Sequence, residues 1–244
     1  GMAPSFLTCN LGKRAITLDL KHAKAKEVVQ RLVATADAVV ENFKPGTIER
    51  LGFGYEALKA IKPDLVYASI SGYGQQGPKS ELPAFDGAIQ ASSGMMSISG
   101  HPESGPTRTG YFSVDMSTAL NAAFAISAAL FRRHLTGEGQ RVDVSMLDTA
   151  VVMQAAQMSN YLVTSTLPEL MGNRSPTRSP TANVFASSDG FVQIVGLREA
   201  HVKDLFKLLG AAELYEKFPE PAARIAHTDD INAVIKPILA AKPS

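Results

Sequence analysis

The sequence is poor in cysteine and histidine, and this excludes two classes of site. Cys9 is the single cysteine, so no disulfide can form within the chain, as is typical of proteins kept in a reducing compartment. We therefore expect a cytoplasmic protein. The five histidines are scattered, and none falls in a zinc-type spacing: His22, His101, His134, His201 and His227. The sequence thus predicts no metal site.

An excess of charge and long apolar runs are also lacking. The chain has 24 Lys and Arg against 23 Asp and Glu, which gives no electrostatic footprint for nucleic acid or for an anionic membrane. The longest apolar run, Ala122–Phe131, is shorter than the roughly 20 residues of a transmembrane helix, and we interpret it as part of a buried helix. Neither a nucleic acid nor a membrane is expected as a partner.

What the sequence has is a regular succession of apolar segments. Of its 244 residues 45% are hydrophobic, enough for the core of one or two domains. Up to Ile70, expected strands alternate with expected helices: strands at Ala15–Leu18, Ala38–Val40 and Leu65–Ile70, helices at Ala23–Ala36 and Tyr55–Ile61, and a short helix capped by Thr47. This order predicts a parallel sheet covered by helices.

Further along the chain, the same signals predict more helix and strand and then a second domain. The expected elements are the long helix Met116–His134, strand Arg141–Met146, helix Asp148–Leu162, a hairpin in Phe185–Val195 turning at Asp189–Gly190, and helices Ala200–Leu209 and Asp230–Ala240. The proline-rich stretch Pro168–Pro180 is the best candidate for a linker. We therefore expect a large domain at 1–165, a linker at 166–182 and a small domain at 183–244.

A glycine-rich segment follows the expected strand that ends at Ile70. Gly72-Tyr-Gly-Gln-Gln-Gly77 matches the dinucleotide-binding pattern, but that pattern needs a helix to open directly, and here Pro78 follows. True dinucleotide binding is therefore disfavoured. Two interpretations stay open: glycines that let the backbone approach a ligand, and an ordinary glycine-rich loop.

The turn Glu41–Thr47 lies between a strand end and a helix start. Free N–H groups there could hold a phosphate, Phe43 offers a flat face for an adenine ring, and Arg50 could contact phosphate oxygens. The alternative is an ordinary strand-to-helix turn with a solvated arginine.

Asp115 stands at the expected start of the long helix. One interpretation is an N-cap aspartate, and the other is an ionised carboxylate nucleophile. The two are compatible, because a helix N-terminus stabilises a carboxylate anion.

Several segments resemble one known family, in order and at close spacing. They are Gly12–Leu20, Ala36–Gly46 with Leu51-Gly52, Pro63–Pro78, Phe85–Ala91, Thr136–Val144, Gly172–Arg174 and Ser188–Gly190. The family is the class III coenzyme A (CoA) transferases, also called the CaiB/BaiF family. It includes formyl-CoA transferase, carnitine CoA-transferases and the alpha-methylacyl-CoA racemase, and the resemblance covers nearly the whole chain.

This resemblance implies a fold and an assembly. The implied fold is α/β: an incomplete, Rossmann-like, doubly wound parallel sheet with a second, smaller α+β domain. The chain begins at what reads as the second unit of such a sheet and is shorter than a typical member, so we expect a truncated member. The implied assembly is a homodimer of interlocked subunits.

The resemblance also implies a site and an activity. Asp115 falls at the position of the aspartate that attacks an acyl-CoA thioester in the family, before CoA passes to a carboxylic acid acceptor. No permanently bound cofactor is expected, since CoA and acyl-CoA are substrates. The implied CoA-binding residues are Asn42, Phe43, Thr47, Arg50, Leu51, Ser71 and Gly72.

Two alternatives to an acyl-CoA:carboxylate CoA-transferase stay open. The chain could be a non-catalytic CoA-binding or dimerising fragment, or one piece of a split enzyme. The racemase branch is disfavoured, because it places a histidine before an aspartate where this chain has Phe85-Asp86, and Phe85 cannot move a proton. Nothing in the sequence identifies the acyl donor or the acceptor acid.

Overall fold

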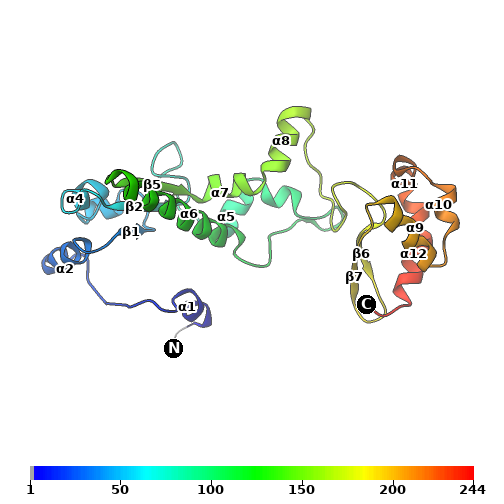
Figure 1. Ribbon diagram of the computed structural model, residues 1–244, viewed down its shortest axis with the longest axis horizontal. Coiled ribbons are helices and arrows are strands. Elements are labelled where there is room, and N and C mark those ends of the chain that lie inside the picture. Colours follow the sequence, from blue (N-terminus) through cyan, green and yellow to red (C-terminus); the bar gives the residue numbers. More distant parts are fainter. Residues whose placement is uncertain (1–2) are drawn as a thin grey trace. The chain divides into compact units, whose positions relative to one another are not determined.

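The computed structural model describes residues 3–244, so the first two residues of the expected large domain lie outside the described range. The chain divides into two compact units (Figure 1). Unit 1 comprises the residues up to Ser92 together with Tyr111–Ala155, and unit 2 comprises Ser93–Gly110 together with Ala156–Ser244. The domain boundaries expected from the sequence stay a prediction.

Unit 1 is built around a parallel sheet of three strands in the order β1-β2-β5, as expected for an α/β fold. The strands are β1 (Ala38–Glu41), β2 (Val66–Ser71) and β5 (Gln140–Ser145). The helices of this unit are α1 (Pro4–Cys9), α2 (Ala23–Val33), α3 (Thr47–Arg50), α4 (Tyr55–Lys59), α5 (Asp86–Ser92), α6 (Ser113–Thr136) and α7 (Met146–Met153).

The central strand β2 alternates its side chains between two apolar layers, which makes the sheet doubly wound. Tyr67 packs with residues of α2, α3 and α4 on one face, whereas Val66 and Ala68 pack with α6 on the other. All three side chains are fully buried. Because burial of a side chain such as Val66 stabilises the fold by about 1.5–3 kcal/mol, these contacts hold helices on both faces of β2.

Helix α6 runs back along the sheet from the carboxyl ends of the strands to their amino ends. It ends where Gly137 adopts the left-handed conformation (φ 74°), and β5 then begins at Gln140. A Cβ atom at Gly139 would lie 2.3 Å from the carbonyl oxygen of Leu65, so only glycine allows this close turn. The N-terminus of α6 therefore lies at the carboxyl end of the sheet.

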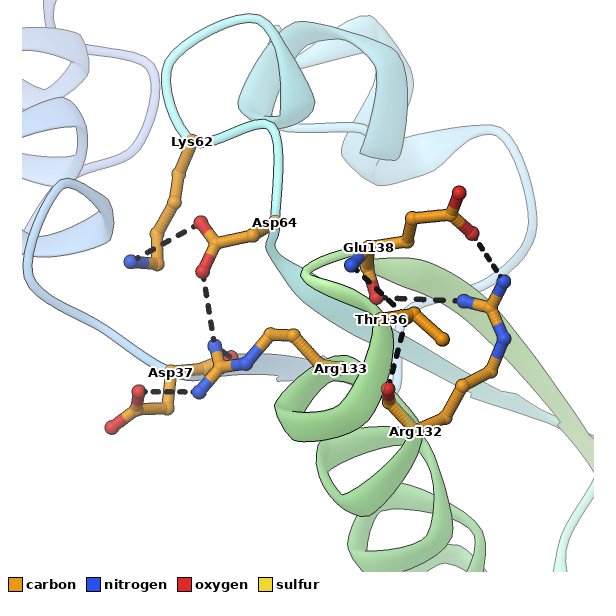
Figure 2. Close-up of polar contacts among 7 residues, drawn as sticks. All are labelled: Asp37, Lys62, Asp64, Arg132, Arg133, Thr136 and Glu138. Carbon is orange, nitrogen blue, oxygen red and sulfur yellow. Dashed lines mark hydrogen bonds and ion pairs between the residues drawn. The ribbon is translucent and has the colours of Figure 1, made fainter.

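A group of charged side chains holds the opposite end of α6 (Figure 2). Arg133 donates to the carboxylate of Asp37 at 2.7 Å and to the Asp37 carbonyl at 3.0 Å, and it lies 3.7 Å from Asp64, which also contacts Lys62. The Arg133 guanidinium holds the pKa of Asp37 below its ordinary value. These contacts join the C-terminal end of α6 to the amino ends of β1 and β2.

The other face of α6 is apolar and exposed. Thr118, Ala122 and Ala129 are buried, but Phe124 is 74% and Phe131 is 65% exposed. The expectation of a buried helix at Ala122–Phe131 is therefore wrong for one of its faces. Among the described residues, α6 is the one helix that could span a membrane by length and composition, a weak criterion that core helices also satisfy.

Unit 2 contains two small antiparallel ribbons and a helical group. The ribbons are β3 (Gly100–His101) with β4 (Gly105–Pro106) and β6 (Ala182–Ala186) with β7 (Phe191–Val195), and the 3-10 helix η1 covers Met95–Ile98. The helices are α8 (Ala155–Thr164), α9 (Glu199–Leu208), α10 (Glu213–Lys217), α11 (Pro221–Ala226) and α12 (Thr228–Ala240). Phe185 of β6 and Phe206 of α9 are in its core.

The structure corrects three expectations about elements. Residues Ala15–Leu18 form no strand, since no other described strand pairs with them. The helix expected over Asp148–Leu162 is two helices, α7 and α8, separated at Gln154. Asp115 is not an N-cap, because α6 begins two residues earlier, at Ser113. The hairpin that turns at Asp189–Gly190 is confirmed.

Candidate functional site

A cleft of about 370 Å³ opens at the carboxyl end of the unit 1 sheet. This is the end at which open α/β sheets bind their ligands. It is lined by the turn after β1, the end of β2, the loop before α5, the first turn of α6 and the start of α7. The residues are Asn42, Phe43, Lys44, Pro45, Ser71, Gly72, Leu82, Pro83, Ala84, Phe85, Asp86, Asp115 and Met146.

The turn after β1 is held by its own side chains. The Asn42 side-chain amide donates to the carbonyl oxygen of Ile70 at 2.7 Å, and the backbone N–H of Phe43 donates to the Glu41 carboxylate at 2.8 Å. The first bond joins the end of β1 to the end of β2. The Phe43 ring is 41% exposed, so its face remains accessible to a ligand.

Ser71, the last residue of β2, lines the cleft and carries a buried hydroxyl group. Ser71 is only 4% exposed, and its Oγ has no hydrogen-bond partner among the described residues. Burying a hydroxyl without a partner is unfavourable. The hydroxyl thus has unused capacity to bind a polar atom of a ligand.

Gly72 lets the loop before α5 approach the end of β2. A Cβ atom here would lie 2.1 Å from the Cβ of Ala84. Its carbonyl oxygen accepts the N–H of Leu147 at 3.0 Å, which fixes the start of α7. The close approach at Gly72 is therefore made by the chain itself, and the interpretation that a ligand approaches the backbone there stays a prediction.

Asp86, which the sequence did not indicate as a site residue, holds the N-terminus of α6. It is 5% exposed, and its Oδ2 accepts the backbone N–H groups of Val114 at 2.8 Å and Asp115 at 3.0 Å. The other oxygen, Oδ1, accepts the side-chain amide of Gln90. A carboxylate from α5 thus supplies the cap that the first residues of α6 do not supply themselves.

Asp115 points from the first turn of α6 into this cleft, and its side chain stays accessible to solvent. Desolvation by the cleft wall, and then the negative charge of Asp86, raise the pKa of the Asp115 carboxyl above its ordinary value. The charged residues that line the cleft are Lys44, Asp86 and Asp115. Asp115 is therefore a reachable carboxylate of raised basicity.

The structure brings together five of the expected site residues and leaves three outside the cleft lining. Asn42, Phe43, Ser71, Gly72 and Asp115 line the cleft. Among the other three, the Arg50 guanidinium donates to the Thr47 hydroxyl at 3.0 Å, and Leu51 packs against the core. The structure thus gives Leu51 a packing role.

Two further lining residues were missed by the sequence reasoning. Lys44 follows Phe43 directly, so its place in the same turn was a usable signal. Asp86 gave no such signal, because its role depends on a contact with α6 across 28 residues of sequence. Among residues 3–244, no group of three or more potential metal ligands is present.

Comparison with known proteins identifies relatives along the whole chain. A family model described as CoA-transferase family III matches residues 1–244. The chain is 36% identical to a succinate–glutarate CoA-transferase from Agrobacterium fabrum, over 96% of this chain and 58% of that protein. It is also 36% identical to an acetyl-CoA:oxalate CoA-transferase from Acetobacter aceti, over 98% of this chain and 62% of that protein.

A solved structure agrees with these relatives. The crystal structure of a CaiB/BaiF family protein from Brucella suis matches with a TM-score of 0.88 and 37% identity, over 96% of this chain and 62% of that chain. The chain therefore spans about three fifths of the length of the proteins that it resembles.

The contact between Asp86 and α6 predicts a change in the titration of Asp115. In Asp86→Asn the amide oxygen can still accept an N–H, but the negative charge is gone. The pKa of Asp115 should therefore fall towards its ordinary value, and weakening the cap should cost about 0.5–2 kcal/mol of stability. Following the Asp115 side-chain carboxyl by ¹³C NMR across pH measures the shift.

The matched control is Asp148→Asn, which removes the same charge from the first turn of α7, outside the cleft lining. This variant should leave the pKa of Asp115 unchanged. Equal shifts in the two variants would mean that overall charge, rather than the Asp86 contact, sets the pKa.

Proposed function

This chain belongs to CoA-transferase family III, and we propose that it acts as an acyl-CoA:carboxylate CoA-transferase. The reaction moves CoA from an acyl-CoA thioester to a carboxylic acid. The chain spans about three fifths of its relatives, so the proposal concerns the activity of the protein to which these residues belong.

One observation supports this proposal above the others: the proposed nucleophile and the proposed CoA-binding turn line the same cleft at the end of the sheet. Asp115, the Asn42–Phe43 turn and Ser71, whose buried hydroxyl is unpaired among the described residues, all line it. A carboxylate that remains accessible can attack an acyl carbon, and partial desolvation increases its basicity. The groups proposed for attack and for binding are therefore within reach of one bound ligand.

We propose the following covalent sequence for Asp115. A carboxylate oxygen attacks the thioester carbonyl carbon, the C–S bond breaks, and the CoA thiolate leaves behind a mixed anhydride. The thiolate then attacks the Asp115 carbonyl carbon of that anhydride, which releases the donor acid and forms an aspartyl-CoA thioester. The acceptor carboxylate repeats these two steps in reverse order. This yields a new acyl-CoA and restores the Asp115 carboxylate.

The turn after β1 is the proposed binding site for CoA. Phe43 presents a partly exposed ring for the adenine, and Lys44 adds a positive charge on the cleft wall. Arg50 and Thr47, which lie outside the lining and hydrogen-bond to each other, are proposed as contacts for the outer phosphates. Ser71 is proposed to donate its hydroxyl to the bound thioester.

The position before Asp86 favours transfer over racemisation. Phe85 lines the cleft and is 78% exposed, and its ring cannot accept or release a proton. Since alpha-proton exchange needs paired acid–base groups, this cleft is better suited to nucleophilic attack. A cytoplasmic location, expected from the single cysteine, and an interlocked homodimer, implied by the family resemblance, complete the proposal.

The proposed intermediate predicts covalent labelling of Asp115. We expect incubation with succinyl-CoA and hydroxylamine to convert the Asp115 carboxyl into a hydroxamate, which peptide mass spectrometry locates. Asp115→Asn should abolish the label, because an amide does not attack the thioester. Omitting succinyl-CoA should abolish it too.

Two outcomes would contradict this. If Asp115 stays unmodified while transfer proceeds, another nucleophile performs the reaction. If CoA binds but neither label nor transfer is found, the chain is a non-catalytic CoA-binding fragment.

The unpaired Ser71 hydroxyl predicts opposite effects on stability and binding. Ser71→Ala removes a buried group without a partner, so the free protein should gain about 1–3 kcal/mol of stability. Affinity for CoA or a CoA thioester should nevertheless fall about three- to tenfold, through loss of one hydrogen bond. Thermal unfolding and calorimetric titration measure the two effects. A variant that is less stable and binds with unchanged affinity would show that the hydroxyl serves the fold alone.

A further inference from the structure

Unit 2 has a cavity of its own, of about 480 Å³, with two arginines on its wall. It lies between α8, the 3-10 helix η1 and the loop that precedes β6. Its lining is Ile98, Ala156, Gln157, Asn160, Thr166, Leu167, Pro168, Glu169, Met171, Gly172, Arg174, Pro176 and Arg178. The proposed transfer mechanism uses none of these residues.

The loop that supplies both arginines is tied to neighbouring segments by backbone hydrogen bonds. The N–H of Ser175 donates to the carbonyl of Ala182 at 3.0 Å, and the N–H of Arg178 donates back to Ser175 at 2.8 Å. At its start, the N–H of Gly172 donates to Gly100 at 2.8 Å. Part of the proline-rich stretch Pro168–Pro180 is therefore a hydrogen-bonded wall of the cavity, and a preformed wall favours ligand binding.

Gly172 also shows how closely this wall packs. A Cβ atom there would lie 2.4 Å from Nδ1 of His101 in β3, so the close contact requires glycine. The ribbon of β3 and β4 thus packs against the start of the loop.

Among the described residues, the two guanidinium groups make few polar contacts. The Nε of Arg174 donates to the Met171 carbonyl at 3.2 Å, and no ion pair of Arg174 is present among the described residues. Arg178 contacts Glu169 at 3.4 Å, with both side chains more than half exposed. Exposed pairs of this kind contribute little to stability, so a ligand could displace Glu169 easily.

Arg178 also has an unfavourable backbone conformation. Its φ is +58°, and only one other non-glycine residue among the described residues, Ser165, has a positive φ. Ser165 directly follows α8, where a left-handed residue is the usual way to end a helix. Arg178 is not at a helix end. An arginine where glycine would be less strained suggests that the guanidinium is needed there.

We propose that this cavity binds a small organic carboxylate, held by Arg174 and by Arg178 once Glu169 is displaced. A guanidinium donates two parallel hydrogen bonds to a carboxylate, and Glu169 already shows that a carboxylate reaches Arg178. The acceptor in the proposed transfer belongs to the same chemical class. Only that link rests on the proposed function, because binding in unit 2 requires no reaction.

The test is calorimetric titration of the protein with glutarate in the absence of CoA. Arg174→Gln should weaken binding by about tenfold or more, as expected for a lost charge-assisted pair. Glu169→Gln should strengthen binding, since it removes the competing carboxylate. The control is Arg198→Gln, which removes the same charge from an exposed site outside the cavity and should bind as the unchanged protein does.

Arg178→Gly separates ligand binding from stability. It removes the guanidinium and also relieves the backbone strain, so it should weaken glutarate binding while its midpoint of thermal unfolding stays level or rises. The proposal would be overturned if the Arg174 and Arg178 variants bound glutarate as tightly as the unchanged protein does. An equal loss in Arg198→Gln would also overturn it, as would equally tight binding of inorganic phosphate, which would indicate a general anion effect.

This outcome is independent of the labelling of Asp115, which needs no acceptor acid. Failure of labelling with glutarate still bound would contradict the transfer reaction and leave the cavity as a carboxylate site. Labelling of Asp115 without glutarate binding would support the transfer reaction and contradict the carboxylate site in unit 2.

Discussion

The candidate site depends on one interaction, the bond between the Asp86 carboxylate and the first N–H groups of α6. It satisfies donors that the helix itself leaves unpaired, and it does so with a negative charge at the positive end of the helix dipole. Because Asp115 is in that first turn, the contact fixes where its carboxylate points. Desolvation by the cleft wall raises the pKa of Asp115, and the like charge that this contact places beside it adds to the effect. The contact with Asp86 therefore fixes the position of Asp115 and contributes to its basicity.

The parallel sheet explains why such distant segments meet. Strands β1, β2 and β5 end at the same edge, and α6 returns along the sheet so that its N-terminus lies there as well. The Arg133 contacts secure the other end of the helix against the amino ends of the strands. Movement of α6 along its axis would break the contacts at both ends of the helix. The fold therefore holds Asp115 at a fixed position relative to the Asn42 turn.

The elements that follow from local sequence patterns could be predicted from the sequence. The features that depend on contacts between distant segments could not. The sheet strands, the long helix and the Asn42–Phe43 turn follow from local apolar patterns and turn residues. Ala15–Leu18 looks like a strand, but strand formation also needs a neighbour to pair with. An aspartate at the expected start of a helix looks like its cap, and Asp115 was therefore a candidate. The residue that caps α6 is Asp86, which belongs to another helix. The role of Asp86 could be recognised only once α5 and α6 were placed together.

A crystal structure of the protein with CoA bound would test the site most directly. We expect the nucleotide to lie against the Asn42–Phe43 turn, with the thiol end in the cleft beside the Asp115 carboxylate and a hydrogen bond from Ser71. A complex with CoA bound elsewhere and the cleft at the end of the sheet empty would contradict this expectation.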